Sequence, residues 1–292
     1  MSVAHRYVVV DVFTDVPLEG NQLAVFTDAA ALPEEVLQRL ARELNLSETV
    51  YVLAPEHGGD ARIRIFTPAA ELPFAGHPVL GTAIVVGIER GLAQVTLETG
   101  AGAVPVALRR GAGDGLAPTG RMERSGYGSM HQPIPTWQRF ERERELLDAL
   151  GVASSGLPVE VYVNGPRHVY VELAREEQVA ALSPDLRALA ALGELGVSCF
   201  AGSGTSWKTR MFAPALGVPE DPATGSAAGP LAVHLARHGR IAFGEEIELR
   251  QGAELGRPSL LRARASGSTD AIELVEVSGA AVIVASGEFV LG

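Results

Sequence analysis

The 292-residue sequence has a single cysteine, no long apolar run and fewer basic than acidic side chains. With Cys199 alone, no intrachain disulfide can form, which agrees with a reducing compartment. The longest apolar stretch, residues 78–88, is much shorter than the roughly 20 residues that cross a bilayer. The net charge of -11, from 24 basic and 35 acidic residues, argues against nucleic acids and anionic membrane surfaces as partners.

Signatures of common cofactor and metal sites are also missing from the sequence. There is no Walker motif and no cysteine cluster, and residues 202–207 lack the third glycine of a dinucleotide-binding loop. His234 and His238 lack the glutamate of a zinc protease motif, so we interpret them as helix-end histidines. Residues 1–15 show no signal-peptide cleavage pattern. We therefore predict a cytoplasmic protein that uses carboxylate, imidazole and hydroxyl groups without a cofactor or metal.

The apolar pattern that is present predicts a mixture of strands and helices. Residues 78–88 are apolar on all sides, which is typical of a buried helix. Residues 230–237 are expected to form another helix, and the strand-rich tail covers residues 273–290. Residues 109–130 contain many glycines and charges, so we expect a loop or linker there.

One short sequence occurs twice, half a chain length apart. Arg64-Ile-Phe-Thr-Pro68 returns as Arg210-Met-Phe-Ala-Pro214, and each copy precedes an acidic residue, a proline, a glycine and an expected helix. Because internal repetition indicates repeated architecture, we predict two similar domains, residues 1–128 and 129–292. The last strand is a candidate to return to the first domain. Such domains would place the two motifs opposite each other across a cleft.

The two expected helix starts could bind an anion. Gly76 precedes one of them, and Gly225 and Ser226 lie at the other. Glycine allows close backbone approach to a ligand, and free N–H groups at a helix start attract negative charge. Together they favour a clamp for a small carboxylate, although each alone could be an ordinary helix cap.

Three further side chains are candidates for proton chemistry. Glu48 lies between a helix exit and a strand entry, where it is either a base that points into a cleft or a solvated turn residue. His77 is either a general acid/base or a packed histidine at a helix start. Asp221 is either catalytic or a turn residue before a proline.

These motifs resemble the PhzF family of phenazine biosynthesis isomerases. The motifs are Asn45-Leu-Ser-Glu48-Thr, Glu71-Leu-Pro-Phe-Ala-Gly76-His77-Pro and Asp221-Pro-Ala-Thr-Gly225-Ser226, with further similarity at residues 17–21, 132–137, 164–168 and 256–259. The resemblance implies an α+β, diaminopimelate-epimerase-like fold. In that fold two similar domains each wrap a sheet around a central helix, the active site lies in the interdomain cleft, and the protein is a homodimer.

The resemblance also implies a cofactor-independent isomerase that converts trans-2,3-dihydro-3-hydroxyanthranilic acid (DHHA) to its aminoketone. Glu48 would shift a proton from C3 to C1, and His77 and Asp221 would position the substrate and relay protons. The carboxylate would be held, and the pocket lined, by the three remaining candidates: Gly76, Gly225 and Ser226.

Two alternatives stay open: an isomerase or epimerase of another small carboxylate, and a non-catalytic small-molecule binder. The two-thiol mechanism of related epimerases and racemases is excluded, because it needs a pair of cysteines. Residues 110–130 look longer than the family pattern, and we expect a mobile insertion away from the chemistry.

Overall fold

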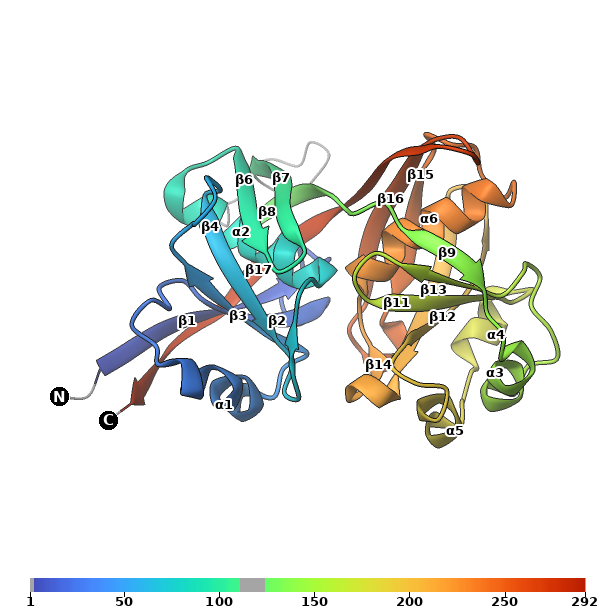
Figure 1. Cartoon of the computed structure of the whole chain (residues 1–292), viewed down its shortest axis with the longest axis horizontal. Coiled ribbons are helices and arrows are strands. Elements are labelled where there is room, and N and C mark those ends of the chain that lie inside the picture. Colours follow the sequence, from blue (N-terminus) through green and yellow to red (C-terminus); the bar gives the residue numbers. More distant parts are fainter. Residues whose placement is uncertain (1–2, 111–123, 292) are drawn as a thin grey trace. The chain divides into compact units, whose positions relative to one another are not determined.

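The computed structural model describes residues 3–110 and 124–291, which form two compact units. Unit 1 comprises Met1–His131 and Ser278–Gly292, and unit 2 comprises Gln132–Val277. The last strand, β17 (Ile272–Leu291), begins in unit 2 and ends in unit 1 (Figure 1). Within these ranges no helix is both long and apolar enough to span a membrane.

The strands of unit 1 form a closed ring. They are β1 (Val3–Val12), β2 (Asn21–Phe26), β3 (Glu48–Leu53), β4 (Ala61–Phe66), β5 (Glu71–Leu72), β6 (Gln94–Thr99), β7 (Gly102–Arg110) and β8 (Ser125–His131). Pairing runs β17–β1–β2–β3–β4–β6–β7–β8 and returns to β17. The β2–β3 and β4–β6 pairs are parallel, and the short β5 pairs with β4.

Helix α2 (Gly76–Arg90) packs against six strands of this ring, and its residues from Gly76 to Gly87 are all buried. The predicted buried helix at residues 78–88 is therefore confirmed, although it begins two residues earlier. At Gly81 a Cβ atom would lie 2.7 Å from Val12 and 2.8 Å from Leu23, so glycine lets the helix approach β1 and β2. Helix α1 (Glu34–Leu44) packs on a separate aromatic cluster that includes Phe26, Tyr51 and Phe66.

Unit 2 surrounds a second buried helix, α6 (Gly225–Arg237). Its strands are β9 (Thr136–Arg139), β10 (Glu160–Val163), β11 (Arg167–Glu172), β12 (Gly196–Ser203), β13 (Ser206–Ala213), β14 (Val218–Asp221), β15 (Glu246–Gln251) and β16 (Ser259–Gly267). Pairing runs β9–β10–β11–β12–β13–β15–β16, with β11–β12 and β13–β15 parallel. Three more helices are α3 (Glu143–Leu150), α4 (Glu176–Ala180) and α5 (Leu186–Ala190), and short 3-10 turns occur at Pro214–Leu216 and Ala253–Leu255.

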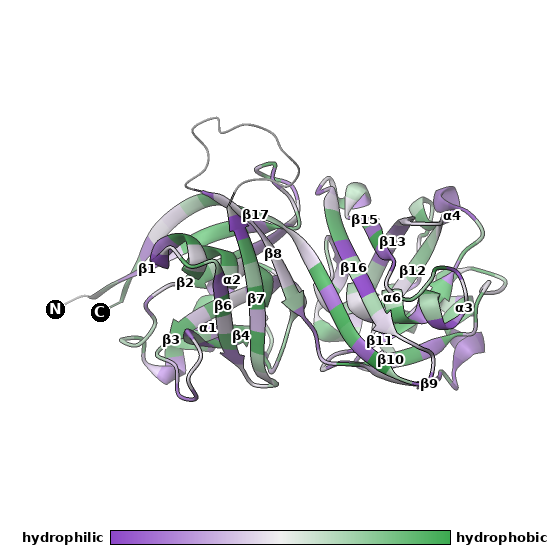
Figure 2. Ribbon diagram, turned by 90° about the horizontal axis from the view of Figure 1, so that it is seen from above, coloured by the Kyte–Doolittle hydropathy of each residue, from purple (hydrophilic) through white to green (hydrophobic). Residues whose placement is uncertain are grey.

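Strand β11 is buried on both faces from His168 to Glu172, and the residues at its centre, Val169 to Val171, are apolar. Val169 and Val171 belong to the apolar cluster under α3, α4 and α5. Tyr170, on the opposite face, contacts His234 of α6 in a stacked arrangement. Strands with one solvent-facing side instead alternate between buried apolar and more exposed polar residues. The hydropathy bands along β16 in Figure 2 show such an alternation.

The repeated sequence has the same structural role in both units. In unit 1 the Arg64 guanidinium donates two hydrogen bonds of 2.7 Å to Glu71 on the next short strand. In unit 2 Arg210 donates to Glu220 at 2.8 and 2.7 Å in the same way. Each of these arginine–glutamate pairs connects a strand to the segment that leads into the central helix. The repeat therefore corresponds to two similar α+β units, as the sequence predicted.

The prediction of a loop at residues 109–130 is wrong at both ends. Arg109 and Arg110 finish β7, and residues 125–130 belong to β8, which pairs with β7 in antiparallel orientation. The glycines of β8 reflect close packing, because a Cβ atom at Gly126 or Gly128 would lie 2.9 Å from Ile84 or 2.6 Å from Leu80 of α2. Residues 111–123, most of the predicted mobile insertion, lie outside the described residues.

The second helix also begins earlier than predicted. The expected range, residues 230–237, is the C-terminal part of α6, which starts at Gly225 and contains Pro230 in its interior. Proline is favoured at the first helical position, and this preference caused the error.

Candidate functional site

In unit 1 the side chains of Glu48 and His77 meet at the starts of β3 and α2. His77 Nε2 lies 3.0 Å from Glu48 Oε2, and both side chains are mostly buried. Strand pairing explains the placement: Glu48 lies opposite Leu23 of β2, and Leu23 faces α2. The carboxylate therefore points toward the helix start that carries His77.

Asn21 is the third member of this group. It opens β2, and its Nδ2 lies 3.2 Å from His77 Nδ1. With the amide donating to Nδ1, the imidazole hydrogen lies on Nε2, the ring nitrogen that is 3.0 Å from Glu48 Oε2. Asn21, His77 and Glu48 thus form one polar cluster, in which the imidazole lies between the amide and the carboxylate.

In unit 2 Asp221 is held at the end of β14. Its Oδ2 accepts a 2.5 Å hydrogen bond from the Thr224 hydroxyl, and its backbone carbonyl accepts one of 2.7 Å from Gln251. Gln251 also donates to the Thr224 hydroxyl at 3.0 Å. Asp221 is therefore a buried and anchored carboxylate just before α6.

The first turn of α6 has an unusual set of hydrogen-bond donors. Pro230 has no N–H, so the Ser226 carbonyl four residues earlier lacks its helical partner. Asn164 Nδ2 supplies the missing hydrogen bond at 3.0 Å. Gln132 donates to the Gly225 carbonyl at 2.8 Å, and the Tyr170 hydroxyl donates to the Ala227 carbonyl at 2.7 Å.

The Ser226 side chain is paired with a buried histidine. His168 Nε2 of β11 lies 3.1 Å from Ser226 Oγ. Burial lowers the pKa of His168 to about 4, so the ring is neutral near pH 7.

The structure thus places the six predicted site residues in two sets. Unit 1 contains Gly76, His77 and Glu48, and unit 2 contains Asp221, Gly225 and Ser226. Four residues that support these sets were not predicted as site residues: Asn21, Gln132, Asn164 and His168. All four lie in the stretches that carry the family resemblance, and this was the available signal. Amides and a buried histidine otherwise resemble ordinary core polar residues.

His234 and His238 surround Glu160 in unit 2. Their Nδ1 and Nε2 atoms lie 3.2 and 3.0 Å from Glu160 Oε2, a spacing that could hold a metal ion. Arg237 donates to the same oxygen at 2.8 Å, so a cation already neutralises the carboxylate. Burial raises the pKa of Glu160, but hydrogen bonds led by those from the two histidines outweigh it and hold the pKa well below its usual range. These contacts fit histidines anchored at a helix end better than metal ligands.

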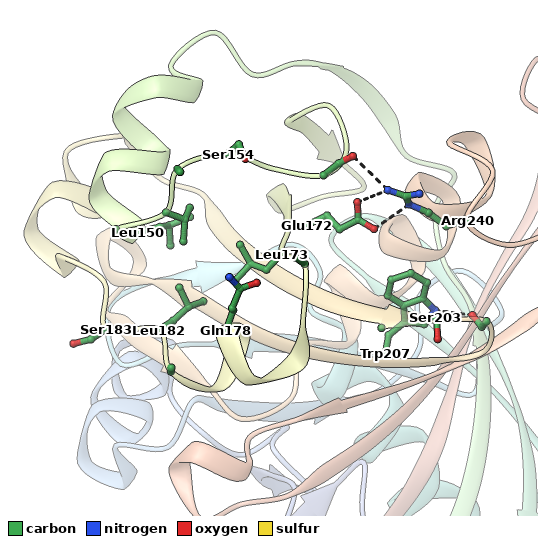
Figure 3. Close-up of a pocket in the computed structure, with 18 residues that line it drawn as sticks. Leu150, Ser154, Glu172, Leu173, Gln178, Leu182, Ser183, Ser203, Trp207 and Arg240 are labelled. Atoms are coloured by element: carbon green, nitrogen blue, oxygen red, sulfur yellow. Dashed lines mark hydrogen bonds and ion pairs between the residues drawn. The ribbon is translucent and has the colours of Figure 1, made fainter.

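A cavity of about 970 Å³ lies in another part of unit 2 (Figure 3). None of the six predicted site residues lines it. Its charged groups, Glu172 and Arg240, are joined by hydrogen bonds of 2.9 and 2.7 Å. The two charged groups of the cavity therefore neutralise each other, and neither is left as an unpaired charge for a ligand.

Comparison with known proteins identifies the family to which this chain is similar. The PhzC-PhzF family, described as phenazine biosynthesis-like protein, matches residues 10–287. A relative from Pseudomonas aeruginosa, named trans-2,3-dihydro-3-hydroxyanthranilate isomerase, is 55% identical over 283 residues, which cover 97% of this chain and 98% of the relative.

Solved structures show the same fold. A predicted epimerase from Pseudomonas aeruginosa matches with a TM-score of 0.82 and 33% identity, covering 99% of this chain and 100% of that one. A hydroxyproline epimerase from Agrobacterium vitis matches with a TM-score of 0.62 and 13% identity, covering 99% and 91%, which shows a shared fold alone. The fold is thus diaminopimelate-epimerase-like, and the chain belongs to the PhzC-PhzF family of phenazine biosynthesis-like proteins.

Proposed function

We propose that this protein is a trans-2,3-dihydro-3-hydroxyanthranilate isomerase. The observation that carries the proposal is the mostly buried Glu48–His77 pair, in a chain 55% identical over nearly its whole length to a relative of that name. A carboxylate positioned in this way suits the removal of a proton from carbon.

Glu48 is the proposed base. Its carboxylate takes the proton from C3 of DHHA, the carbon that bears the hydroxyl group, and a proton is returned to C1, the carbon that bears the carboxylate. The ring double bonds shift so that C3 becomes an enol carbon, and the enol tautomerises to the aminoketone. Atoms and electrons balance without an oxidant or a cofactor. Proton transfer by one positioned group typically contributes about 10²–10⁴-fold to the rate.

His77 holds the base in place in this proposal. Its Nε2, 3.0 Å from Glu48 Oε2, can donate to that oxygen and take up charge as the proton moves. Asn21 fixes the imidazole from the other side. His77 and Asp221 remain the proposed residues for positioning the substrate and relaying protons.

The start of α6 is the proposed carboxylate-binding element. Gly225 and Ser226 lie in its first turn, where N–H groups and the helix dipole favour an anion. Gly76 opens α2 in the same way in unit 1. DHHA is itself a carboxylate, so its charge matches these helix starts.

Proton NMR of DHHA in D₂O with purified protein and no added cofactor tests the function. Wild type is expected to consume DHHA and to introduce solvent deuterium into the product. Glu48→Gln is expected to lose at least about 10²-fold in rate, whereas the exposed Glu43→Gln control keeps full activity. Folded wild-type protein that leaves DHHA unchanged would refute the activity and favour an isomerase of another small carboxylate. A fully active Glu48→Gln variant would refute the assigned base.

The proposal also includes a homodimer, which the family resemblance implies, and a cytoplasmic location. Light scattering coupled to size-exclusion chromatography should give twice the 30.6 kDa chain mass. A monomer at working concentration would contradict the dimer without affecting the assigned chemistry.

A further inference from the structure

His168 is buried between Ser226 and the backbone of β12. It is 3% exposed, and its Nε2 contacts Ser226 Oγ at 3.1 Å. Its Nδ1 is buried without a hydrogen-bond partner. Strand pairing places His168 opposite Gly196, and a Cβ atom there would lie 2.8 Å from Nδ1. Glycine therefore leaves just enough room for the imidazole.

This environment determines where the imidazole hydrogen lies. The ring is neutral, because its pKa of about 4 lies well below neutral pH, and it carries one hydrogen. A hydrogen on Nδ1 would be a buried donor without an acceptor. Buried backbone N–H donors without partners are rarer than backbone carbonyl acceptors without partners, and a buried imidazole N–H meets the same desolvation cost. The hydrogen is therefore on Nε2, which donates to Ser226 Oγ.

The direction of this hydrogen bond sets the role of the serine. Since Ser226 Oγ accepts from His168, its own hydrogen is free to point elsewhere. Asn164, four residues before His168, holds the Ser226 backbone carbonyl at 3.0 Å. One short segment thus fixes both the backbone and the hydroxyl group of Ser226.

We propose that His168 is a positioning residue that turns the Ser226 hydroxyl into a hydrogen-bond donor for the substrate carboxylate. The proposal rests on the proposed function, which supplies the carboxylate. A hydroxyl that donates to an ionised acceptor forms a stronger hydrogen bond than one between neutral groups. Without His168, the Ser226 hydroxyl could rotate, and its hydrogen would point toward the substrate carboxylate for only part of the time.

The test compares His168→Leu, which removes the donor, with His168→Gln, whose side-chain amide can keep a donor near the Nε2 position. Each is made in the wild-type and in the Ser226→Ala background. Cys199→Ala, a buried substitution on β12, controls for a general loss of stability. We would measure kcat and KM for DHHA, and the Kd of anthranilate, a carboxylate of the same skeleton.

His168→Leu is expected to raise KM and the anthranilate Kd about 10-fold with kcat changed less than about threefold. His168→Gln should restore most of the binding, and Cys199→Ala should leave it unchanged. In the Ser226→Ala background, His168→Leu should change Kd less than about twofold, because the group through which it acts is gone. A folded His168→Leu variant with unchanged Kd, or with an equal effect in both backgrounds, would overturn the proposal.

Gly196→Ala gives an independent route if His168→Leu does not fold. Its methyl group would press on His168 Nδ1 without changing either partner. The anthranilate Kd should rise in the wild-type background and not with Ser226→Ala, and any other pattern overturns the proposal. Wild-type protein that binds anthranilate but leaves DHHA unchanged would refute the isomerase while His168 remained under test. Wild-type protein that binds no anthranilate would overturn the carboxylate site itself.

Discussion

Asn164→Ala should destabilise the protein because Pro230 leaves the Ser226 carbonyl dependent on the Asn164 side chain. Asn164 is 4% exposed, and its Nδ2 donates to that carbonyl at 3.0 Å. A buried acceptor left without a donor costs about 1–3 kcal/mol. The Asn164 Oδ1 atom is itself buried without a partner, and its removal offsets part of that cost. We therefore expect a loss of about 2 kcal/mol in the free energy of unfolding.

Pro230→Ala provides the decisive comparison. Alanine restores an N–H group four residues after Ser226, so the helix can satisfy the carbonyl without Asn164. In that background Asn164→Ala should cost about 1 kcal/mol less than in wild type.

Urea unfolding of wild type, both single variants and the double variant measures this coupling, provided that the dependence of the free energy on urea stays constant across the set. An equal cost of Asn164→Ala in both backgrounds would show that the carbonyl does not depend on the amide, and the account of the α6 start would then be wrong.

Two further predictions concern the repeated ion pairs and the buried histidine. Glu220→Gln should cost about 3 kcal/mol, because it leaves the buried Arg210 guanidinium without its counter-charge. The matched Glu71→Gln should cost less than about 1 kcal/mol, because the Glu71 side chain is 42% exposed. Thermal unfolding of the two variants measures the difference. Similar decreases in Tm would contradict the view that burial makes the Arg210–Glu220 pair the more sensitive of the two. For His168, the unfolded chain binds a proton near pH 6.5 that the folded protein does not accept until about pH 4. The free energy of unfolding should therefore fall by about 3 kcal/mol as pH falls through this window. His168→Gln should remove that part of the decrease in urea unfolding followed from pH 7 to pH 4, and an unchanged pH profile would show that the ring is not held neutral.

The central helices illustrate what local sequence could and could not reveal. The apolar character of residues 78–88 on all sides predicted the burial of α2, and the segment before each central helix carried a recognisable repeat. Their exact starts were missed because proline normally marks a first turn. Pro78 is tolerated inside α2 because the residue four positions earlier precedes the helix. Pro230 is tolerated because Asn164, far away in sequence, replaces the lost donor.

The site shows the same division between local and distant information. Glu48, His77, Asp221 and Ser226 stood out because each lies in a motif with a chemical rationale, and their catalytic and binding roles stay predictions. Their partners did not stand out. Asn21 is 56 residues from His77, and His168 is 58 residues from Ser226. Such pairs come together only in the folded protein. Periodicity and motif spacing along the chain therefore cannot predict them.

The crossing of β17 between the units has a consequence for the order of folding during synthesis. Unit 2 is one continuous segment, Gln132–Val277, whereas the ring of unit 1 needs residues 278–291 between β1 and β8. A ribosome therefore finishes every residue of the second unit before it supplies the strand that closes the first. Until then β1 and β8 present open edges, which are prone to pairing with other chains. Unit 1 is therefore synthesised first but completed last. Truncation after Val277 would remove the strand that closes unit 1 and leave unit 2 whole.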